Sequence, residues 1–144
     1  MSTDITVGDK ILFEVPEGWL GRVSLTLGHP IGADKSWTIS LMSDKLPRNM
    51  TVAEYGQAQG DVLRSGLSGF TEARFFEFET DAGKVPIREY SWKSGHSEVA
   101  QCQAYLAGLH DVWTLTFTAP SPDYNELRQI IPDLIRSIRL GKGV

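Results

Sequence analysis

The chain has 144 residues, of which 41% are hydrophobic and 22% charged, and its formal net charge is −4 at pH 7. Its basic residues are scattered, which leaves no electrostatic footprint for nucleic acid. No stretch approaches the roughly 20 consecutive apolar residues that a membrane span needs. The single cysteine, Cys102, excludes an internal disulfide. We therefore expect one domain over residues 1–144, with no nucleic-acid partner and no direct membrane insertion.

The first half of the chain predicts three strands and a helix. Alternating apolar residues place the strands at 11–15, 23–27 and 37–42. The run Thr51-Val-Ala-Glu54 is a capping box, which predicts a helix that starts there and ends in the glycine-rich stretch 66–69. Only ten residues precede the first strand, and they contain no apolar run that could serve as a secretion signal. We therefore expect a cytoplasmic protein.

The second half predicts four strands in succession and a closing helix. The strands fall at 72–80, 85–92, 98–107 and 111–119. In the closing helix Ser121 is the expected N-cap, and Pro122 takes the first helical position. Apolar residues from Leu127 to Ile138 form one stripe, and Pro132 inside it is expected to kink or split the helix. The order of elements predicts an α+β domain with a mainly antiparallel sheet of about six or seven strands and two main helices.

One face of the predicted sheet has an unusual composition. In the strand Trp113–Thr118 the apolar residues point one way and three threonines the other. Gln101 and Gln103 share a face of the preceding strand, and Thr38 lies on a similar mixed face. Threonine is favoured in strands by β-propensity alone, so this surface can be a solvated outer face. Alternatively, it binds a mostly apolar partner whose backbone carbonyls need hydrogen-bond donors.

The sequence contains no motif for catalysis or metal binding. Its three histidines, His29, His96 and His110, fall in predicted loops or turns without metal-ligand spacing. Cys102 alternates with alanines, which is typical of a small core residue rather than a nucleophile. We therefore expect no enzymatic activity, no metal and no cofactor. A Ser-His-Asp set assembles in space, so spacing along the chain does not test for one.

The chain resembles the DcrB and PsbP-like domains in an ordered set of short features. The run Phe13-Glu-Val-Pro-Glu-Gly-Trp19 is similar to their opening. The helix start at 51–55, the run 67–70 and the run 83–86 before Tyr90-Ser-Trp92 recur in the same order, followed by the Gln-x-Gln and Trp113–Thr118 strands. Among members without a signal peptide, the sequence is most similar to the Eag-type chaperones of type VI secretion.

This resemblance implies a PsbP-like sandwich, a homodimer and a chaperone function. Eag-type chaperones bind the N-terminal transmembrane helices of PAAR-containing effectors, including Rhs toxins, before export. The partner-binding positions of that family fall on Gln59, Gln103 and Thr38, and near Val23 and Leu25. A one-residue gap after Trp19 leaves the register of the last two open, and Thr38 stands where the family has an aliphatic residue. The alternatives are a general protein-binding module with a soluble partner, and a small-ligand binder or hydrolase on the same fold.

Overall fold

The structure is a computed structural model, described over residues 3–7, 11–15, 24–30, 36–81, 83–108 and 111–138, with the backbone alone for the first two ranges. Its elements are β1 (Thr3–Val7), β2 (Ile11–Val15), β3 (Ser24–Pro30), β4 (Ser36–Lys45), α1 (Val52–Gly66), β5 (Thr71–Thr80), β6 (Gly83–Ser94), β7 (Ser97–Ala107), β8 (Asp111–Pro120), the 3-10 turn η1 (Ser121–Asp123) and α2 (Tyr124–Ser137).

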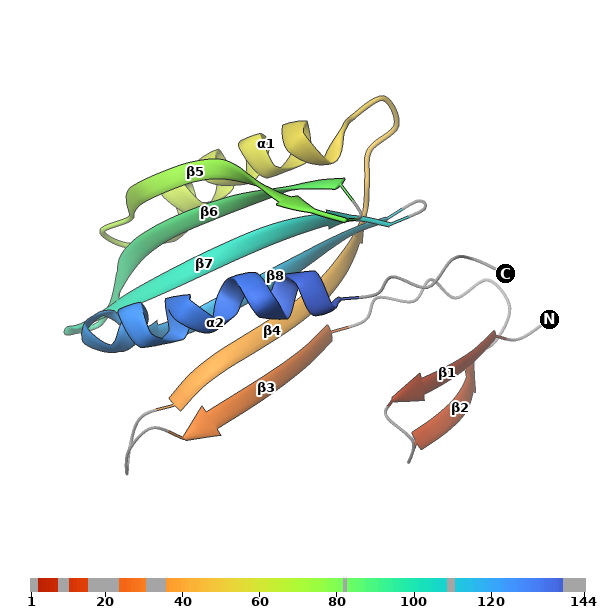
Figure 1. Ribbon diagram of the computed structural model, residues 1–144, viewed down its shortest axis with the longest axis horizontal. Helices are drawn as coiled ribbons and strands as arrows, with labels where there is room; N and C mark the ends of the chain where they lie inside the picture. Colours follow the sequence, from red (N-terminus) through yellow and green to blue (C-terminus); the bar gives the residue numbers. More distant parts are fainter. Residues whose placement is uncertain are drawn as a thin grey trace.

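Six of the strands form one antiparallel sheet in the order β3-β4-β8-β7-β6-β5 (Figure 1). This confirms the predicted α+β class, the mainly antiparallel sheet and the two main helices. The pattern of residues does not predict the strand Thr3–Val7, which the structure contains. Residues 11–15 form the predicted strand but pair with β1 in a separate two-stranded sheet. The predicted first strand is therefore not part of the main sheet.

Helix α1 covers one face of the sheet over β6 and β7. The predicted capping box is present: Glu54 N donates to Thr51 Oγ1 at 3.1 Å, and Thr51 N donates to Glu54 Oε1 at 3.1 Å. The helix lies close to the strands because two glycines, Gly56 and Gly60, face them and are buried. A Cβ atom at Gly56 would lie 2.8 Å from Cδ2 of Tyr105. Larger residues at these positions would push α1 away from the sheet.

Replacing Gly56 with alanine is therefore expected to destabilise the protein, although alanine favours helices by about 1 kcal/mol. The Tyr105 ring is fully buried and cannot move aside, so we expect a net loss of about 1–3 kcal/mol in the free energy of unfolding. Gly66 of the same helix is the matched control, because a Cβ there would meet nothing within 4 Å. Urea unfolding should show Gly66→Ala neutral or stabilised. Equal behaviour of the two variants would contradict the close helix–sheet contact.

Helix α2 covers the opposite face and closes the hydrophobic core. Leu127, Ile131 and Ile135 are buried against side chains that include Leu115 and Phe117 of β8. The apolar stripe is thus confirmed, and the helix runs through Pro132 as one element rather than being split. Because residues of the stripe pack on both sides of the proline, the core holds the two halves of the helix together.

The predicted N-cap at Ser121 is wrong. The chain enters α2 through the 3-10 turn η1, which has no side-chain cap, and Ser121 Oγ donates instead to Glu98 Oε1 at 3.2 Å. A serine followed by proline carries the signature of a helix start, but here the helix begins three residues later. The Ser121 hydroxyl instead connects η1 to β7 through its hydrogen bond with Glu98.

Candidate partner-binding face

The register of the sheet gathers the hydroxyl and amide side chains on the face that carries α1. Thr116 pairs with Gln103 and Ser40, and Thr118 pairs with Gln101 and Thr38. Paired residues in an antiparallel sheet point to the same side, so these rows continue across four strands. We call this surface the amide–hydroxyl face; it consists of Thr26, Thr38, Ser40, Met42, Gln101, Gln103, Thr114, Thr116 and Thr118.

Both glutamines of this face are held by hydrogen bonds on two sides. Gln103 Nε2 donates to Thr116 Oγ1 at 3.3 Å, and Gln103 Oε1 accepts from the Tyr105 hydroxyl at 2.6 Å. Gln101 Nε2 donates to Thr118 Oγ1 at 2.9 Å, and its Oε1 accepts from the Trp92 indole at 2.9 Å. The hydroxyl oxygens of Thr116 and Thr118 accept these hydrogen bonds, and each hydroxyl keeps its own hydrogen to donate. The face therefore presents ordered donors rather than mobile side chains.

The row of Gln103 is anchored by a buried arginine that sequence reasoning missed. Arg88 of β6 is only 2% exposed. Its Nη1 donates to the Tyr105 hydroxyl at 3.1 Å and to the Gly56 carbonyl at 2.6 Å, and its Nε pairs with Glu72 at 2.6 Å. No local pattern distinguishes Arg88 from a solvated strand residue, because its burial depends on the position of α1.

Helix α1 borders the amide–hydroxyl face with an uncharged flank. Tyr55, Gln59 and Val62 share this flank by their helical spacing, and the Tyr55 ring packs edge-on against Tyr105 of β7, with centroids 6.2 Å apart. The other flank points toward β5 and is charged: it includes Asp61 and lines a depression with Glu72. The two sides of one helix therefore differ in charge.

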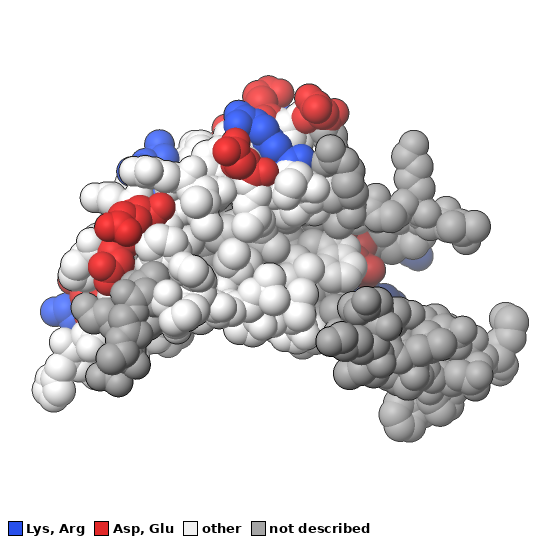
Figure 2. All heavy atoms as spheres, turned by 60° about the horizontal axis from the view of Figure 1, so that its bottom comes forward, with Lys and Arg blue, Asp and Glu red and all other residues white. Residues whose placement is uncertain are grey.

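The strands beside this flank contain no Lys, Arg, Asp or Glu over the ranges 24–30, 36–43, 99–107 and 112–120. Figure 2, in which the β3 edge of the sheet comes forward, shows uncharged side chains across the middle of that side and charged ones above and to the left. A sheet face that only meets water usually carries charged residues, and these ranges carry none. The composition thus favours contact with a partner.

The structure brings together three of the predicted partner-binding residues. Gln103 and Thr38 lie on the amide–hydroxyl face, and Gln59 is half-buried on the neighbouring flank of α1. Leu25 does not join them: it pairs with Leu41, which pairs with Leu115 of the core, so it lies on the α2 side. The expectation that Leu25 lines the same surface is corrected, since a one-residue difference in register reverses the face. Val23 lies outside the described residues.

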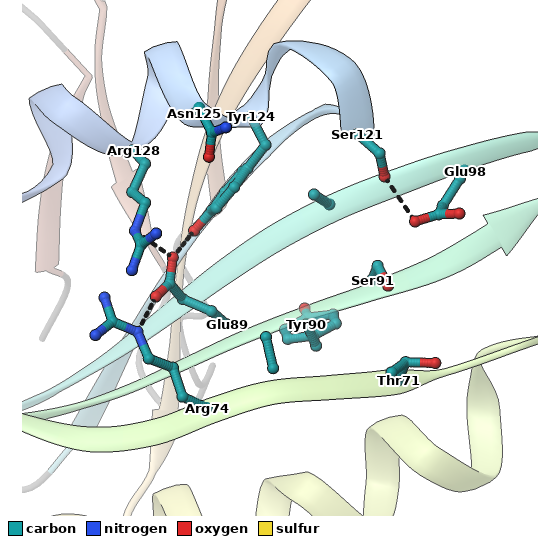
Figure 3. A pocket seen from close by; sticks show the side chains of 12 residues that line it. Thr71, Arg74, Glu89, Tyr90, Ser91, Glu98, Ser121, Tyr124, Asn125 and Arg128 are labelled. Atoms are coloured by element: carbon teal, nitrogen blue, oxygen red, sulfur yellow. Dashed lines mark hydrogen bonds and ion pairs between the residues drawn. The ribbon is translucent and has the colours of Figure 1, made fainter.

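A second polar cluster lies on the α2 side. Arg74 of β5 and Tyr124 and Arg128 of α2 converge on Glu89 of β6, which is only 5% exposed (Figure 3). Glu89 Oε1 pairs with Arg74 Nε, while Oε2 accepts from the Tyr124 hydroxyl at 2.5 Å and pairs with Arg128 Nε at 3.2 Å. Burial raises the pKa of Tyr124, and the neighbouring Cys102 and Glu89 raise it further, so the phenol stays a donor.

This cluster borders an open depression of about 350 Å³, but its groups are used in holding α2 to the sheet. Both oxygens of Glu89 are engaged, which leaves no lone carboxylate poised as a general base. Among the residues that the structure describes, no group of three or more His, Cys, Asp or Glu side chains could hold a metal ion. We therefore assign the cluster a structural role.

Cys102 is expected to be unreactive in the folded protein. It is 1% exposed, and burial, followed by the charge of Glu89, raises the pKa of its thiol to about 12. Since the thiolate is the reactive form, a disulfide reagent at pH 8 should label it only after unfolding. Labelling in native buffer as fast as in urea would contradict its burial. Because the folded pKa is raised, the protonated thiol contributes stability below about pH 9 that is lost as the pH rises toward 12.

The described helices include none that is long and apolar enough to span a membrane. The chain has a six-stranded antiparallel sheet with a helix on each face, and a solved PsbP structure matches it. It is therefore an α+β domain of PsbP-like fold. The DcrB family profile matches residues 12–137, and the chain belongs to the DcrB family. The resemblance to the DcrB and PsbP-like domains is confirmed.

Three solved structures show the same fold at low identity. PA94, a protein of unknown function from Pseudomonas aeruginosa, superposes with a TM-score of 0.83 at 13% identity, over 99% of both chains. LpqN from Mycobacterium tuberculosis, which is involved in cell envelope biogenesis, gives 0.53 at 18% identity over 90% of this chain and 84% of its own. PsbP from Synechocystis sp. PCC 6803 gives 0.55 at 9% identity over 90% and 86%. A comparison with curated proteins found no match.

Proposed function

We propose that this protein is a non-enzymatic, homodimeric cytoplasmic chaperone or adaptor. It binds and shields the N-terminal transmembrane helices of a type VI secretion PAAR or Rhs effector before export. The observation that supports this most directly is the amide–hydroxyl face, which is uncharged, rich in ordered donors and bordered by the uncharged flank of α1. Membership of the DcrB family is consistent with this function.

A transmembrane helix in water needs both an apolar cover and hydrogen-bond partners. Its exposed apolar surface costs roughly 25 cal/mol per Å², which drives aggregation unless a chaperone covers it. In membranes such helices pack through small residues, with Ser, Thr and Gln as hydrogen-bonding groups. The amide–hydroxyl face offers the same groups on a rigid sheet: threonine methyls for apolar contact, and hydroxyl hydrogens for carbonyls or polar side chains of the bound helix.

The test is co-expression with the N-terminal region of a PAAR effector that contains its hydrophobic spans. We expect the effector region to stay in the soluble fraction and to co-purify with the chaperone, and to aggregate without it. The same effector lacking those spans serves as the control and should not co-purify. If only the spanless effector binds, the protein is a general binding module with a soluble partner, and if neither binds, the chaperone proposal fails.

A further inference from the structure

The cluster of Arg74, Glu89 and Arg128 leaves part of each guanidinium group unused. Arg74 pairs through Nε with Oε1 of Glu89, and Arg128 pairs through Nε with Oε2 at 3.2 Å. Because both arginines bind one carboxylate, one from β5 and one from α2, their guanidinium groups lie side by side (Figure 3). Over the described ranges, the Nη groups of both arginines have no hydrogen-bond partner. Each arginine therefore keeps the two-pronged edge that binds carboxylates and phosphates in proteins.

The cluster also carries more positive charge than the pairing of Glu89 requires. Arg74 and Arg128 each carry one positive charge, and Glu89 cancels one of them, so one remains. The Tyr124 hydroxyl bonds to Glu89 but adds no charge. The two arginine side chains are 49% and 45% exposed, whereas that of Glu89 is 7% exposed. The unmatched charge therefore faces outward, where an anion can reach it.

A small apolar cavity lies beside the two arginines, between β5 and α2. Its volume is about 180 Å³. Apart from the cluster itself, the described residues that line it are all uncharged: Phe76, Phe78, Ile87, Cys102, Ile131 and Pro132. The guanidinium of Arg74 lies 4.2 Å from the centroid of the Phe76 ring. The charged edge and the apolar cavity are therefore parts of one site.

Charge and volume together define the chemistry of a ligand for this site. The cavity is smaller than the roughly 300–1,000 Å³ of pockets for drug-sized molecules, so it fits a short alkyl chain. One unmatched positive charge matches a carboxylate better than a phosphate group, which carries a charge of roughly −2 at neutral pH. A cation would be repelled by the two arginines. A neutral alcohol would leave their Nη groups without an anion.

We propose that this cavity binds a small monocarboxylate with a short apolar chain. The carboxylate oxygens accept hydrogen bonds from the Nη groups of Arg74 and Arg128, and the chain packs among Phe76, Phe78 and Ile131. Because the ligand bridges β5 and α2, it stabilises the folded protein. The site lies on the α2 side of the sheet, opposite the amide–hydroxyl face, so it goes beyond the proposed function and does not depend on it.

The first experiment titrates sodium hexanoate into the wild-type chain and follows the backbone amide signals by nuclear magnetic resonance. We expect saturable shifts centred on β5 and α2, with a dissociation constant in the millimolar range or below for so small a ligand. Acetate lacks the chain, hexanol lacks the charge and hexylamine reverses it, so each should bind at least about ten-fold more weakly. The absence of saturable shifts with hexanoate, or equal binding of any of the other three compounds, overturns the proposal.

The second experiment tests the arginine edge with Arg128→Gln. In this variant Arg74 still pairs with Glu89, so the carboxylate keeps a cationic partner. We expect the affinity for hexanoate to fall about ten-fold or more, because one two-pronged donor and the unmatched charge are both lost. Arg64→Gln is the matched control: the Arg64 side chain is 56% exposed and pairs with a single carboxylate, but it lies on α1, on the opposite face. Its affinity should equal that of wild type.

Circular dichroism and thermal melting check that the variants fold. If Arg128→Gln does not fold, Arg74→Gln replaces it with the same expectation, since Arg128 then remains as the partner of Glu89. Unchanged affinity in the folded variant contradicts the site. Equal losses in this variant and in Arg64→Gln would reduce the effect to net charge and overturn the proposal. No effector is present in either experiment, so the outcome does not depend on whether the chaperone proposal holds.

Discussion

Replacing Arg88 with methionine is expected to lower the free energy of unfolding by about 3–5 kcal/mol, the range for breaking a buried ion pair. The guanidinium is 2% exposed and bonds to Glu72, to the Tyr105 hydroxyl and to the Gly56 carbonyl of α1. It also stacks 4.2 Å from the centroid of Phe75. Methionine fills similar space, but it removes the bonds to the Glu72 carboxylate and the Gly56 carbonyl and one of the two bonds of the Tyr105 hydroxyl. Because domains are stable by only about 5–15 kcal/mol, this single change threatens folding.

Equilibrium unfolding in urea, followed by circular dichroism, measures the loss. Lys84→Met is the matched control: Lys84 lies on the same strand and pairs with Glu77 and Glu79, but at 3.7 and 4.0 Å and with its side chain 64% exposed. Exposed pairs contribute about 0–1 kcal/mol, so this variant should be close to wild type. A loss below 1 kcal/mol for Arg88→Met would show that the arginine is not the anchor between α1, β5 and β7.

The parts of the fold that local chemistry determines could be predicted from the sequence. The capping box at Thr51 and Glu54 marks the start of α1 because both of its hydrogen bonds form within four residues. The apolar stripe through Leu127 and Ile131 predicts the buried face of α2 because helical spacing alone defines it. In Trp113–Thr118 apolar residues alternate with threonines, and neighbouring residues of a strand point to opposite faces. This alternation alone therefore predicts that the threonines point away from the core.

The remaining features depend on contacts between distant segments. Leu25 lies on the α2 side because of how β3 pairs with β4, and a shift of one residue would have placed it on the same face of the sheet as Gln103. The burial of Arg88 and Glu89, neighbours on β6 that point to opposite faces, requires a helix on each side of the sheet. Neither residue differs in local sequence from a solvated charge. Pairing of β1 with β2, rather than with the main sheet, is likewise a choice that no local pattern determines.

Replacing Gln59 with glutamate is expected to weaken binding of the effector helices about 100-fold. Glutamate has nearly the shape of glutamine, so the change adds a negative charge to the uncharged flank of α1 and little else. If an apolar helix lies against this flank, the carboxylate must lose water without gaining a partner. A cost of about 2.7 kcal/mol gives the 100-fold effect. The measurement is competition binding with a soluble fusion that carries the effector's hydrophobic spans.

Gln57→Glu is the matched control, because Gln57 lies on the same helix but on the flank that lines the depression with Asp61 and Glu72. Both variants change the net charge equally, and both positions accept glutamate in a helix. Only the Gln59 variant should lose binding, while the two thermal midpoints stay within a few degrees of wild type. If both variants lose binding equally, the effect is one of net charge. If neither does, the bound helix lies elsewhere than against the Tyr55–Gln59–Val62 flank.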